Sequence, residues 1–302
     1  MTAGGESTYF ALLCPSYHGA TMLSALLSNH SQICSAGDGN PGWRDPNRIP
    51  CKCGRSIAVC DFWQGLAGLR ETGGKPANEF WFPTTPKIIA GSAAGNLRLA
   101  KALAFSSFKL KRNLMARLFP QAARRFTDTV SRYAAFCRDY HGTPVFFDGE
   151  KSFAKYCSLQ ACGYPIGGVI HFVRDPRAYA ASAKKRGVAA NVAAAEWSAY
   201  HERLNAMASW GGRTRVLRVR YEDLVAEADR TLGLITGFMG LNPEALTRPP
   251  QLDRLHLIGN SLRGFDGVPR QGRSWEAALT TPEIETVAQS CRALMREFGY
   301  RD

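Results

Sequence analysis

The chain has 302 residues, 45% of them apolar and 21% charged, which is enough for one α/β domain to bury a sizeable core. This mixture is typical of a globular protein and excludes a collagen-like or disordered chain. Lysine and arginine exceed the acidic residues by 38 − 25 = 13, which predicts an anionic ligand or partner. Net charge alone does not distinguish a nucleotide, a nucleic acid, an acidic glycan and a membrane surface.

The apolar runs and the cysteine content together predict the cellular compartment of the protein. No apolar run approaches the ~20 residues that cross a bilayer, and no basic region precedes the first run. We therefore expect neither a transmembrane segment nor a signal peptide. Nine cysteines, an odd number, favour a reducing compartment with mostly free thiols, so we expect a cytoplasmic protein. The oligomeric state stays open, with a homodimer as one option.

Short runs rich in β-branched and aromatic residues alternate with helix-like stretches along the chain. We expect strands at Tyr9–Cys14, Pro144–Asp148, Gly168–Val173 and Arg213–Tyr221. The expected helices are Thr21–Asn29, Phe153–Ala161, Pro176–Arg186, Val192–Trp210 and Asp229–Met239. This alternation predicts an α/β fold with a parallel sheet covered on both faces. Ligands of such sheets bind beyond the carboxyl ends of the strands, so we expect the chemistry there.

The strand signal fades between Ser35 and Gly142, where Asn96–Tyr140 has a helical pattern. From Arg98 to Arg138 the chain carries ten lysines or arginines and one acidic residue, Asp128. We find no internal repeat. We therefore expect a single domain over residues 1–302 with a mainly helical insertion at about 35–142 that binds the substrate, because such folds change substrate through their loops.

A strand-to-helix turn follows the first predicted strand, with the sequence Cys14-Pro-Ser-Tyr-His-Gly-Ala-Thr-Met22. A loop of this kind directs backbone N–H groups and a helix N-terminus toward one point, which suits a phosphate. It is not a Walker A loop, because no Gly-Lys-Ser/Thr follows at the required spacing. Taken alone, the segment is also compatible with a plain βα turn.

A second strand-to-helix turn holds Arg174-Asp175-Pro176-Arg177. Asp175 can cap the following helix, and Pro176 suits its first position. Ser182 lies six residues after Pro176, which is about 9 Å along the helix axis. Arg174 and the Ser182 hydroxyl can therefore meet around a single phosphate. The alternative is a capped surface helix with a solvated arginine.

Together these segments resemble the sulfotransferases that use 3′-phosphoadenosine 5′-phosphosulfate (PAPS), especially the bacterial and carbohydrate-type branch. Cys14–Leu27 is similar to their 5′-phosphosulfate loop, and Arg174 with Ser182 is similar to their 3′-phosphate motif. Arg220–Leu224 resembles the family's Tyr-Glu-Asp-Leu at a late strand end. Further segments resemble its C-terminal region: His256–Arg263, Arg273–Trp275 and Phe298–Tyr300. The match spans residues 9–34 and 144–300.

The resemblance implies a P-loop-type three-layer sandwich with a central parallel β-sheet flanked by helices, plus the helical insertion. It implies an enzyme that moves a sulfuryl group from PAPS to a hydroxyl or amine of a small-molecule or carbohydrate acceptor, releases 3′-phosphoadenosine 5′-phosphate (PAP) and requires no metal. Arg174 and Ser182 would hold the 3′-phosphate, Tyr221 would lie by the adenine, and Arg263–Arg273 would close over the nucleotide. The implied donor-binding residues are Tyr17, His18, Gly19, Ala20, Thr21, Met22, Arg174, Ser182, Tyr221, Arg263, Arg270 and Gly272.

One position departs from the family's pattern. Tyr17 stands where the loop of these enzymes places lysine or arginine, a cation that neutralises the bridging oxygen as sulfate leaves. A protonated His18 or an arginine of the C-terminal segment is the expected substitute. The alternative is a non-catalytic relative that binds a nucleotide or a polyanion. No nucleic-acid recognition motif is present, so we expect no specific nucleic-acid partner.

Asp148-Gly149-Glu150-Lys151-Ser152 follows the second predicted strand. Sulfuryl transfer to an alcohol needs a base that takes the hydroxyl proton. Glu150-Lys151-Ser152, followed by Tyr156, resembles the Glu-Lys-Ser/Thr segment of glycan sulfotransferases, whose glutamate is the catalytic base. The resemblance thus implies Glu150 as the base and Lys151 as the group that stabilises the transferring sulfuryl. Asp148 and His18 are the alternative bases.

Cys51, Cys53 and Cys60 place three thiols within ten residues. With Cys34 or a histidine as a fourth ligand, these thiols could hold structural zinc, and a disulfide is an equal alternative. Because the spacing is not the paired C-x₂-C of an established zinc site, we assign no metal from the sequence.

Overall fold

The structure is a computed structural model that describes residues 8–39, 45–69, 86–88, 92–109, 113–209, 215–251, 255–259, 265–270 and 275–301. Two of the expected donor-binding residues, Arg263 and Gly272, lie outside the described residues. Within these ranges, no helix combines the length and the apolar character needed to span a bilayer.

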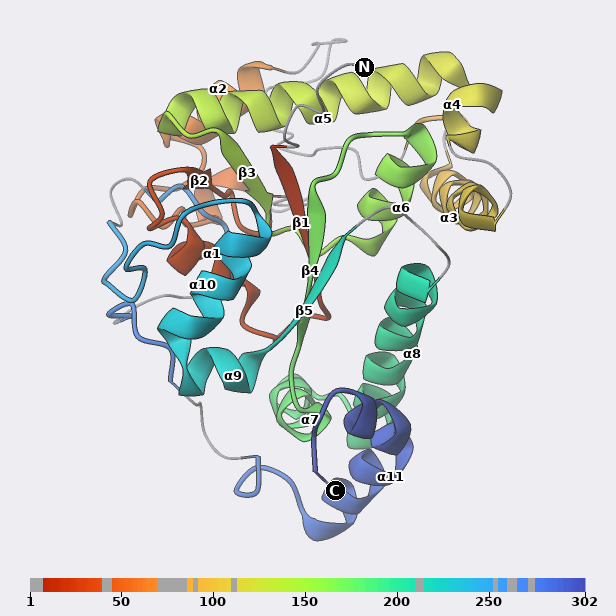
Figure 1. The fold of residues 1–302 in the computed structure, drawn as a ribbon, viewed down its shortest axis with the longest axis vertical. Coiled ribbons are helices and arrows are strands. Elements are labelled where there is room, and N and C mark those ends of the chain that lie inside the picture. Colours follow the sequence, from red (N-terminus) through yellow and green to blue (C-terminus); the bar gives the residue numbers. More distant parts are fainter. Residues whose placement is uncertain are drawn as a thin grey trace.

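A parallel sheet of five strands, in the order β2-β3-β1-β4-β5, forms the centre of the described chain (Figure 1). Its strands are β1 (Tyr9–Leu13), β2 (Ile33–Cys34), β3 (Val145–Asp148), β4 (Gly168–Val173) and β5 (Val216–Arg220). Four of them lie within the predicted ranges. The edge strand β2 escaped prediction because it is two residues long, with Ile33 opposite Val145 and Cys34 opposite Phe146.

Helices cover both faces of this sheet. Those described are α1 (Ala20–Leu27), α2 (Asp61–Gly68), α3 (Ala93–Lys109), α4 (Leu114–Leu118), α5 (Pro120–His141), α6 (Phe153–Cys162), α7 (Pro176–Lys184), α8 (Ala190–Ser209), α9 (Tyr221–Ala226), α10 (Ala228–Phe238) and α11 (Thr281–Glu297), with a 3₁₀ turn at Pro46–Arg48. Figure 1 shows α7, α8 and α11 gathered at the end of the molecule where the C-terminus lies.

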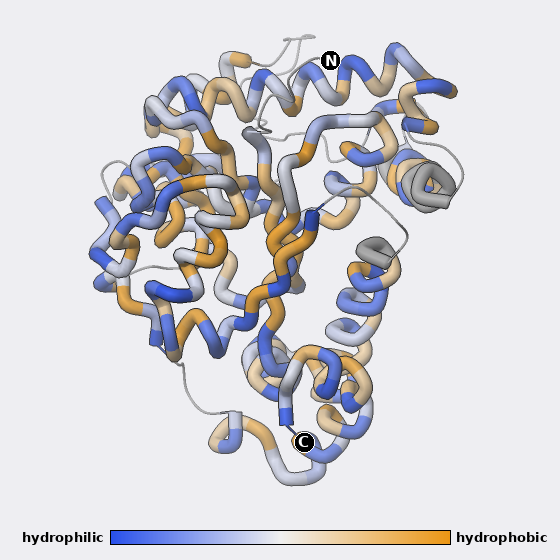
Figure 2. The backbone as a smooth tube through the Cα atoms, viewed as in Figure 1, coloured by the Kyte–Doolittle hydropathy of each residue, from blue (hydrophilic) through white to orange (hydrophobic). Residues whose placement is uncertain are grey.

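The molecule has a hydrophobic core on each face of the sheet, and successive side chains of a strand point alternately into one and the other. On β1, Tyr9, Ala11 and Leu13 pack into one core with residues of α5 and α6. Phe10 and Leu12 point the other way, into a core that includes residues of α1 and α10. Figure 2 shows the hydrophobic stretches along the central strands. This arrangement confirms the predicted α/β three-layer sandwich.

The predicted insertion supplies α2, α3, α4 and α5. Phe126 and Tyr133 of α5 belong to the same core as the sheet. Phe62 of α2 contacts Phe136 of α5, with ring centroids 5.7 Å apart. The insertion therefore packs directly on the sheet through α5.

The loops after β1, β3, β4 and β5 leave one edge of the sheet, because these strands are parallel. Directly after β3, the chain passes very close to α1. A Cβ atom added to Gly149 would lie 2.5 Å from Ser24 Oγ and 2.9 Å from the Gly37 carbonyl oxygen. Only glycine fits there, and this contact places the next residue, Glu150, at the carboxyl edge.

A buried ammonium group joins β3 to α6 below that edge. Lys155 Nζ lies 2.8 Å from Asp148 Oδ2 and 2.9 Å from Glu150 Oε2, and its side chain is 3% exposed. The Tyr9 hydroxyl donates a further hydrogen bond to Asp148. Burial lowers the pKa of Lys155, but the charges of Asp148 and Glu150 outweigh that effect and raise it overall. These ion pairs fix the Glu150 carboxylate.

Three imidazoles form a buried cluster beside the same edge. His171 Nε2 of β4 lies 2.8 Å from His201 Nδ1 of α8, and the His18 ring centroid is 5.7 Å from that of His201. Burial, together with nearby positive charges, lowers the pKa values of His18 and His171 to about 3. Burial also lowers the pKa of His201. The cluster is therefore uncharged at neutral pH.

We predict that Lys155→Met strongly destabilises the fold. The substitution leaves Asp148 and Glu150 buried without their counter-charge, which typically costs about 3–5 kcal/mol of unfolding free energy. Lys184→Met is the control, because Lys184 pairs with Glu283 on the surface, where ion pairs contribute little. Urea unfolding measures both variants, and equal changes would show that the buried pairs do not hold this region together.

The histidine cluster predicts a pH dependence of stability. The ordinary pKa of 6.5 is lowered to about 3 for His18 and His171, so below pH 6.5 the unfolded chain binds protons that the folded chain does not. Stability is therefore lost as the pH falls from 6.5 toward 3, by up to about 1.4 kcal/mol per pH unit for each histidine. His171→Gln should reduce this slope by one histidine's share in unfolding experiments at several pH values. An unchanged slope would contradict the prediction.

Candidate active site

The loop between β1 and α1 turns sharply at two positions. Gly19 has a φ angle of 86°, and Tyr17 has a φ angle of 64°. A non-glycine residue in this left-handed region costs about 1–3 kcal/mol and is held there by its surroundings. Arg174 stabilises this backbone conformation of Tyr17, because its Nη1 donates a hydrogen bond to the Tyr17 carbonyl oxygen at 2.6 Å. This bond fastens the loop to the carboxyl end of β4.

Arg174 lies close to two other residues that are predicted to bind the donor, Tyr221 and Gly19. Its guanidinium stacks on the Tyr221 ring, 4.5 Å from the ring centroid. A Cβ atom on Gly19 would lie 3.0 Å from that same ring. Arg174 Nε is buried and has no hydrogen-bond partner. An unsatisfied, buried guanidinium N–H is a strong donor for an anion, so the arrangement suits a phosphate or sulfate.

The other predicted donor residues that the structure describes make contacts of their own. The Tyr221 hydroxyl donates to the Arg270 carbonyl oxygen at 3.0 Å, while the Arg270 side chain pairs with Asp266 on the surface. Ser182 is half-buried on α7, and its hydroxyl donates to the Ala178 carbonyl oxygen at 2.9 Å. The first turn of α1 carries Ala20, Thr21 and Met22.

Glu222 links three of the segments that carried the resemblance. Its Oε1 accepts a hydrogen bond from the Asp175 backbone N–H at 3.0 Å, and its Oε2 accepts one from the Tyr300 hydroxyl at 2.8 Å. The Asp175 side chain in turn accepts from the Arg177 backbone N–H, which confirms the predicted helix cap. Sequence reasoning did not find the role of Glu222, because an acid in the first turn of a helix indicates only where that helix begins.

A cavity of about 450 Å³ opens beside the loop after β1, and two of the three residues predicted to be catalytic, Glu150 and Lys151, line it. Its walls come from that loop, from the residues after β3, and from α7 and α8. The lining residues are Cys14, Pro15, Ser16, Tyr17, Glu150, Lys151, Tyr179, Ala183, Val188, Glu196 and Tyr200. Glu150 and Lys151 thus share one cavity with Tyr17.

Contacts to the backbone and to the side chain of Lys151 both restrain its position. It has a φ angle of 64°, and its carbonyl oxygen accepts a hydrogen bond from the Tyr200 hydroxyl at 3.2 Å. Its ammonium group pairs with Asp38 of the insertion. Burial lowers the pKa of Lys151. Neither Asp38 nor Tyr200 was predicted, because both are distant from Lys151 in sequence and stand in no recognisable motif.

His18 does not fit the role of substitute cation. Its side chain is fully buried, its Nδ1 lies 2.9 Å from the Ser16 carbonyl oxygen, and it is not among the residues that line the cavity. With a pKa lowered to about 3 by burial, its imidazole carries no charge at neutral pH. Within the described residues, Lys151 is the cation that lines the cavity with Tyr17.

Comparison with known proteins is consistent with this geometry. A model of the sulfotransferase family matches residues 76–244, which is 169 of the 302 residues. A search of curated proteins finds no match. Among solved structures, the sulfotransferase domain of the Synechococcus PCC 7002 olefin synthase aligns with a TM-score of 0.54 and 18% identity, covering 100% of this chain and 98% of that domain. The sulfotransferase domain from the curacin biosynthetic pathway aligns with a TM-score of 0.50 and 15% identity, covering 99% of each chain.

At these identities the two structures show a shared fold, and the family match covers more than half of the chain. The chain belongs to the sulfotransferase family.

Proposed function

We propose that this protein transfers a sulfuryl group from PAPS to a hydroxyl or amine of a small-molecule or carbohydrate acceptor. The observation that carries the proposal is the unpartnered, buried Nε of Arg174, at the point where the ends of β1, β4 and β5 meet. A donor with a 3′-phosphate and a 5′-phosphosulfate supplies the anions that this point lacks.

The donor would be held mainly by groups at the carboxyl edge of the sheet. Arg174 and Ser182 are the proposed ligands of the 3′-phosphate, and Gly19 with the first turn of α1 would receive the 5′-phosphosulfate. Tyr221 offers an aromatic face for the adenine. The glycine at position 19 supports this assignment, because a larger residue would meet the Tyr221 ring.

Chemistry would take place in the cavity next to this donor site. In the proposed reaction Glu150 takes the proton of the acceptor hydroxyl while the acceptor oxygen attacks sulfur. The bond from sulfur to the 5′-phosphate oxygen breaks, and PAP leaves. The ion pair with Lys155 fixes the Glu150 carboxylate at the cavity, where it would meet the acceptor hydroxyl. Lys151 would stabilise the charge of the sulfuryl group, in place of the lysine or arginine that these enzymes carry at the position of Tyr17.

The acceptor would be bound by the insertion, at about residues 35–142, of a single domain. Asp38, which pairs with Lys151, places a residue of that insertion beside the cavity. Nine cysteines outside any disulfide fit the reducing cytoplasm as the place of action.

We predict that PAP binding depends on Arg174. Arg174→Ala should weaken the binding of PAP at least tenfold in calorimetric titration, because the lost hydrogen bonds to a charged group are typically worth about 1.5–3 kcal/mol. Arg218→Ala, which removes an arginine at the surface of β5, is the control and should bind PAP normally. Adenosine 5′-monophosphate should bind more weakly than PAP to the unaltered protein. Equal binding of the two nucleotides would refute PAPS as the donor.

We also predict that Glu150→Gln lowers turnover while PAP affinity stays the same. Loss of a general base typically reduces the rate by roughly 10²–10⁴-fold. Glu196→Gln is the matched control, because Glu196 lines the same cavity and accepts a hydrogen bond from the Tyr179 hydroxyl. PAP release would be measured with PAPS and a panel of phenols, alcohols, amines and oligosaccharides.

Full turnover by Glu150→Gln would remove Glu150 from the role of base. If the unaltered protein binds PAP but releases none from PAPS with any acceptor of the panel, the chain is instead a non-catalytic, nucleotide-binding relative. The replacement of the loop cation by Tyr17 is the observation that favours this second function.

A further inference from the structure

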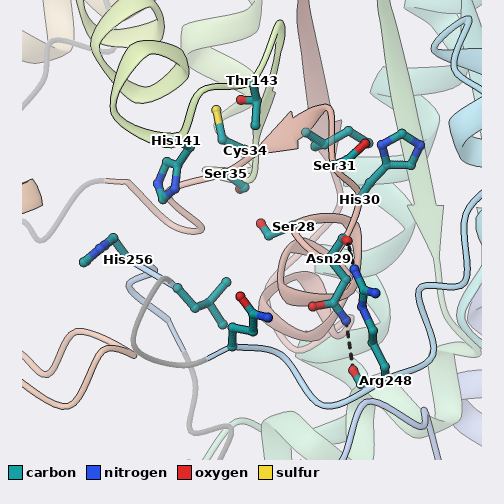
Figure 3. A pocket seen from close by; sticks show the side chains of 13 residues that line it. Ser28, Asn29, His30, Ser31, Cys34, Ser35, His141, Thr143, Arg248 and His256 are labelled. Carbon is teal, nitrogen blue, oxygen red and sulfur yellow. Dashed lines mark hydrogen bonds between the residues drawn. The ribbon is translucent and has the colours of Figure 1, made fainter.

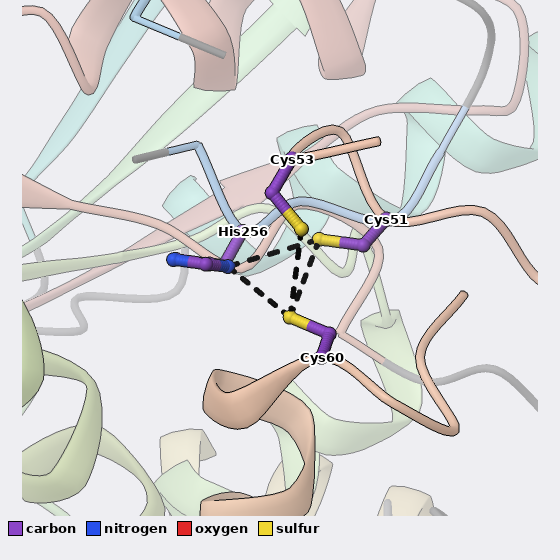
Figure 4. A group of neighbouring side chains, drawn as sticks. All are labelled: Cys51, Cys53, Cys60 and His256. Carbon is purple, nitrogen blue, oxygen red and sulfur yellow. Dashed lines mark hydrogen bonds between the residues drawn. The ribbon is translucent and has the colours of Figure 1, made fainter. Parts of the chain in front are cut away.

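Four side chains of types that bind metals converge at a point outside the cavity of the proposed active site. Cys51, Cys53 and Cys60 come from the segment before α2, and His256 comes from the segment at 255–259 (Figure 4). Their three sulfur atoms and one ring nitrogen all lie within 4.8 Å of one another. Cys51, Cys60 and His256 are buried, and Cys53 is half-buried.

Four of the six distances within this cluster are close to those around a tetrahedral ion. Zinc bonds of about 2.3 Å to sulfur and about 2.05 Å to nitrogen place two sulfurs about 3.8 Å apart and a sulfur and a nitrogen about 3.6 Å apart. The Cys60 sulfur lies 3.6 Å from that of Cys53, 3.9 Å from that of Cys51 and 3.3 Å from His256 Nδ1. The Cys51 sulfur lies 3.9 Å from His256 Nδ1.

We propose that Cys51, Cys53, Cys60 and His256 bind a structural zinc ion. Three thiolates and one imidazole form a ligand set that zinc favours and that magnesium or calcium does not. Four protein ligands fill the tetrahedron and leave no open position for a reacting molecule, so the site is structural and not catalytic. A disulfide would use two of the three thiols and leave the third, together with His256, without a role.

The surroundings hold the ligands in place. The His256 ring stacks on Phe62 with an interplanar angle of 14° and a centroid distance of 5.1 Å, and the Tyr140 ring meets it edge-on at 5.2 Å. Gly54, with a φ angle of 90°, turns the chain between Cys53 and Cys60. Supporting groups of this kind fix the orientation of a metal ligand.

A second cavity, of about 310 Å³, borders one of the four ligands, His256. It lies beside the edge strand β2 and is bordered by His256 together with His141, Thr143 and Arg248 (Figure 3). In the same view the ring of His256 lies near that of His141 at one side of the cavity, and the two ring centroids are 5.7 Å apart. The cluster itself is not fully closed to solvent, because Cys53 is only half-buried.

The ion would join two parts of the chain that are far apart in sequence. The segment at 255–259 already bonds to the insertion, since the Lys52 backbone N–H donates to the Leu257 carbonyl oxygen at 3.2 Å and the Asp38 N–H donates to that of Ile258 at 2.9 Å. At its end, Gly259 lies so close to α1 that an added Cβ would be 2.4 Å from Thr21 Oγ1. Zinc would thus anchor this segment next to the loop after β1.

The test is metal content, measured on the full chain purified under reducing conditions. We expect one zinc per chain by mass spectrometry of the metals. Replacement by Co²⁺ should give the visible absorption of tetrahedral cobalt and a sulfur-to-metal charge-transfer band. Removal of zinc by a strong chelator should lower the melting temperature. None of these measurements depends on sulfotransferase activity.

Variants identify the ligands. Cys53→Ser and His256→Ala should lose zinc to a chelator concentration that leaves the unaltered protein loaded, whereas Cys53→His, which keeps a ligand, should retain more zinc than Cys53→Ser. Cys34→Ser is the matched control and should keep its zinc, because the Cys34 thiol points to the Val145 carbonyl oxygen. Reduced, folded protein that holds no zinc and binds no Co²⁺ would overturn the proposal. A disulfide between two of the three cysteines of the cluster in protein taken from cells would also overturn it.

Discussion

The parallel arrangement of the sheet is the constraint on which the site depends. Because β1, β3, β4 and β5 all run in the same direction, the residues that follow them emerge along one edge. This brings together Tyr17, Glu150, Arg174 and Tyr221, although more than 200 residues separate the first from the last. A one-residue change in the register of β3 would move the Asp148 side chain to the opposite face of the sheet. Lys155 would then lose its ion pair with Asp148.

The cations at this edge are each restrained before any ligand binds. Lys155 lies between two carboxylates, Lys151 pairs with Asp38, and Arg174 holds the Tyr17 carbonyl and stacks on Tyr221. Such positioned charges need little reorganisation when an anion arrives, which is the condition for effective electrostatic stabilisation. The buried Nε of Arg174, which has no hydrogen-bond partner among the described residues, is a point where such an anion would gain a hydrogen bond.

Sequence alone predicted the elements well where their signal is local. The strand ranges were found because short β-branched and aromatic runs are typical of strands, and the Asp175 cap was predicted from the order Asp-Pro-Arg. The two residues of β2 carry no such signal. The environment of a side chain was harder to predict: His18 was considered as a charged group, but its pKa depends on burial that only the fold reveals. For the cysteine cluster, the spacing of the thiols says nothing about His256, which lies 196 residues after Cys60.

Within the proposed function, Lys151 takes the role that the resemblance gives to a cation at position 17. A lysine or arginine at position 17 would be carried by the loop after β1, whereas Lys151 reaches the same cavity from the loop after β3. Transition-state stabilisation depends on where a charge lies and not on which segment carries it. Tyr17 and Lys151 both have left-handed backbone conformations. A hydrogen bond to the carbonyl oxygen stabilises each of them: Arg174 donates to Tyr17, and the Tyr200 hydroxyl donates to Lys151. In the proposed reaction, a strained tyrosine therefore shapes the loop, and the charge comes from the neighbouring strand end.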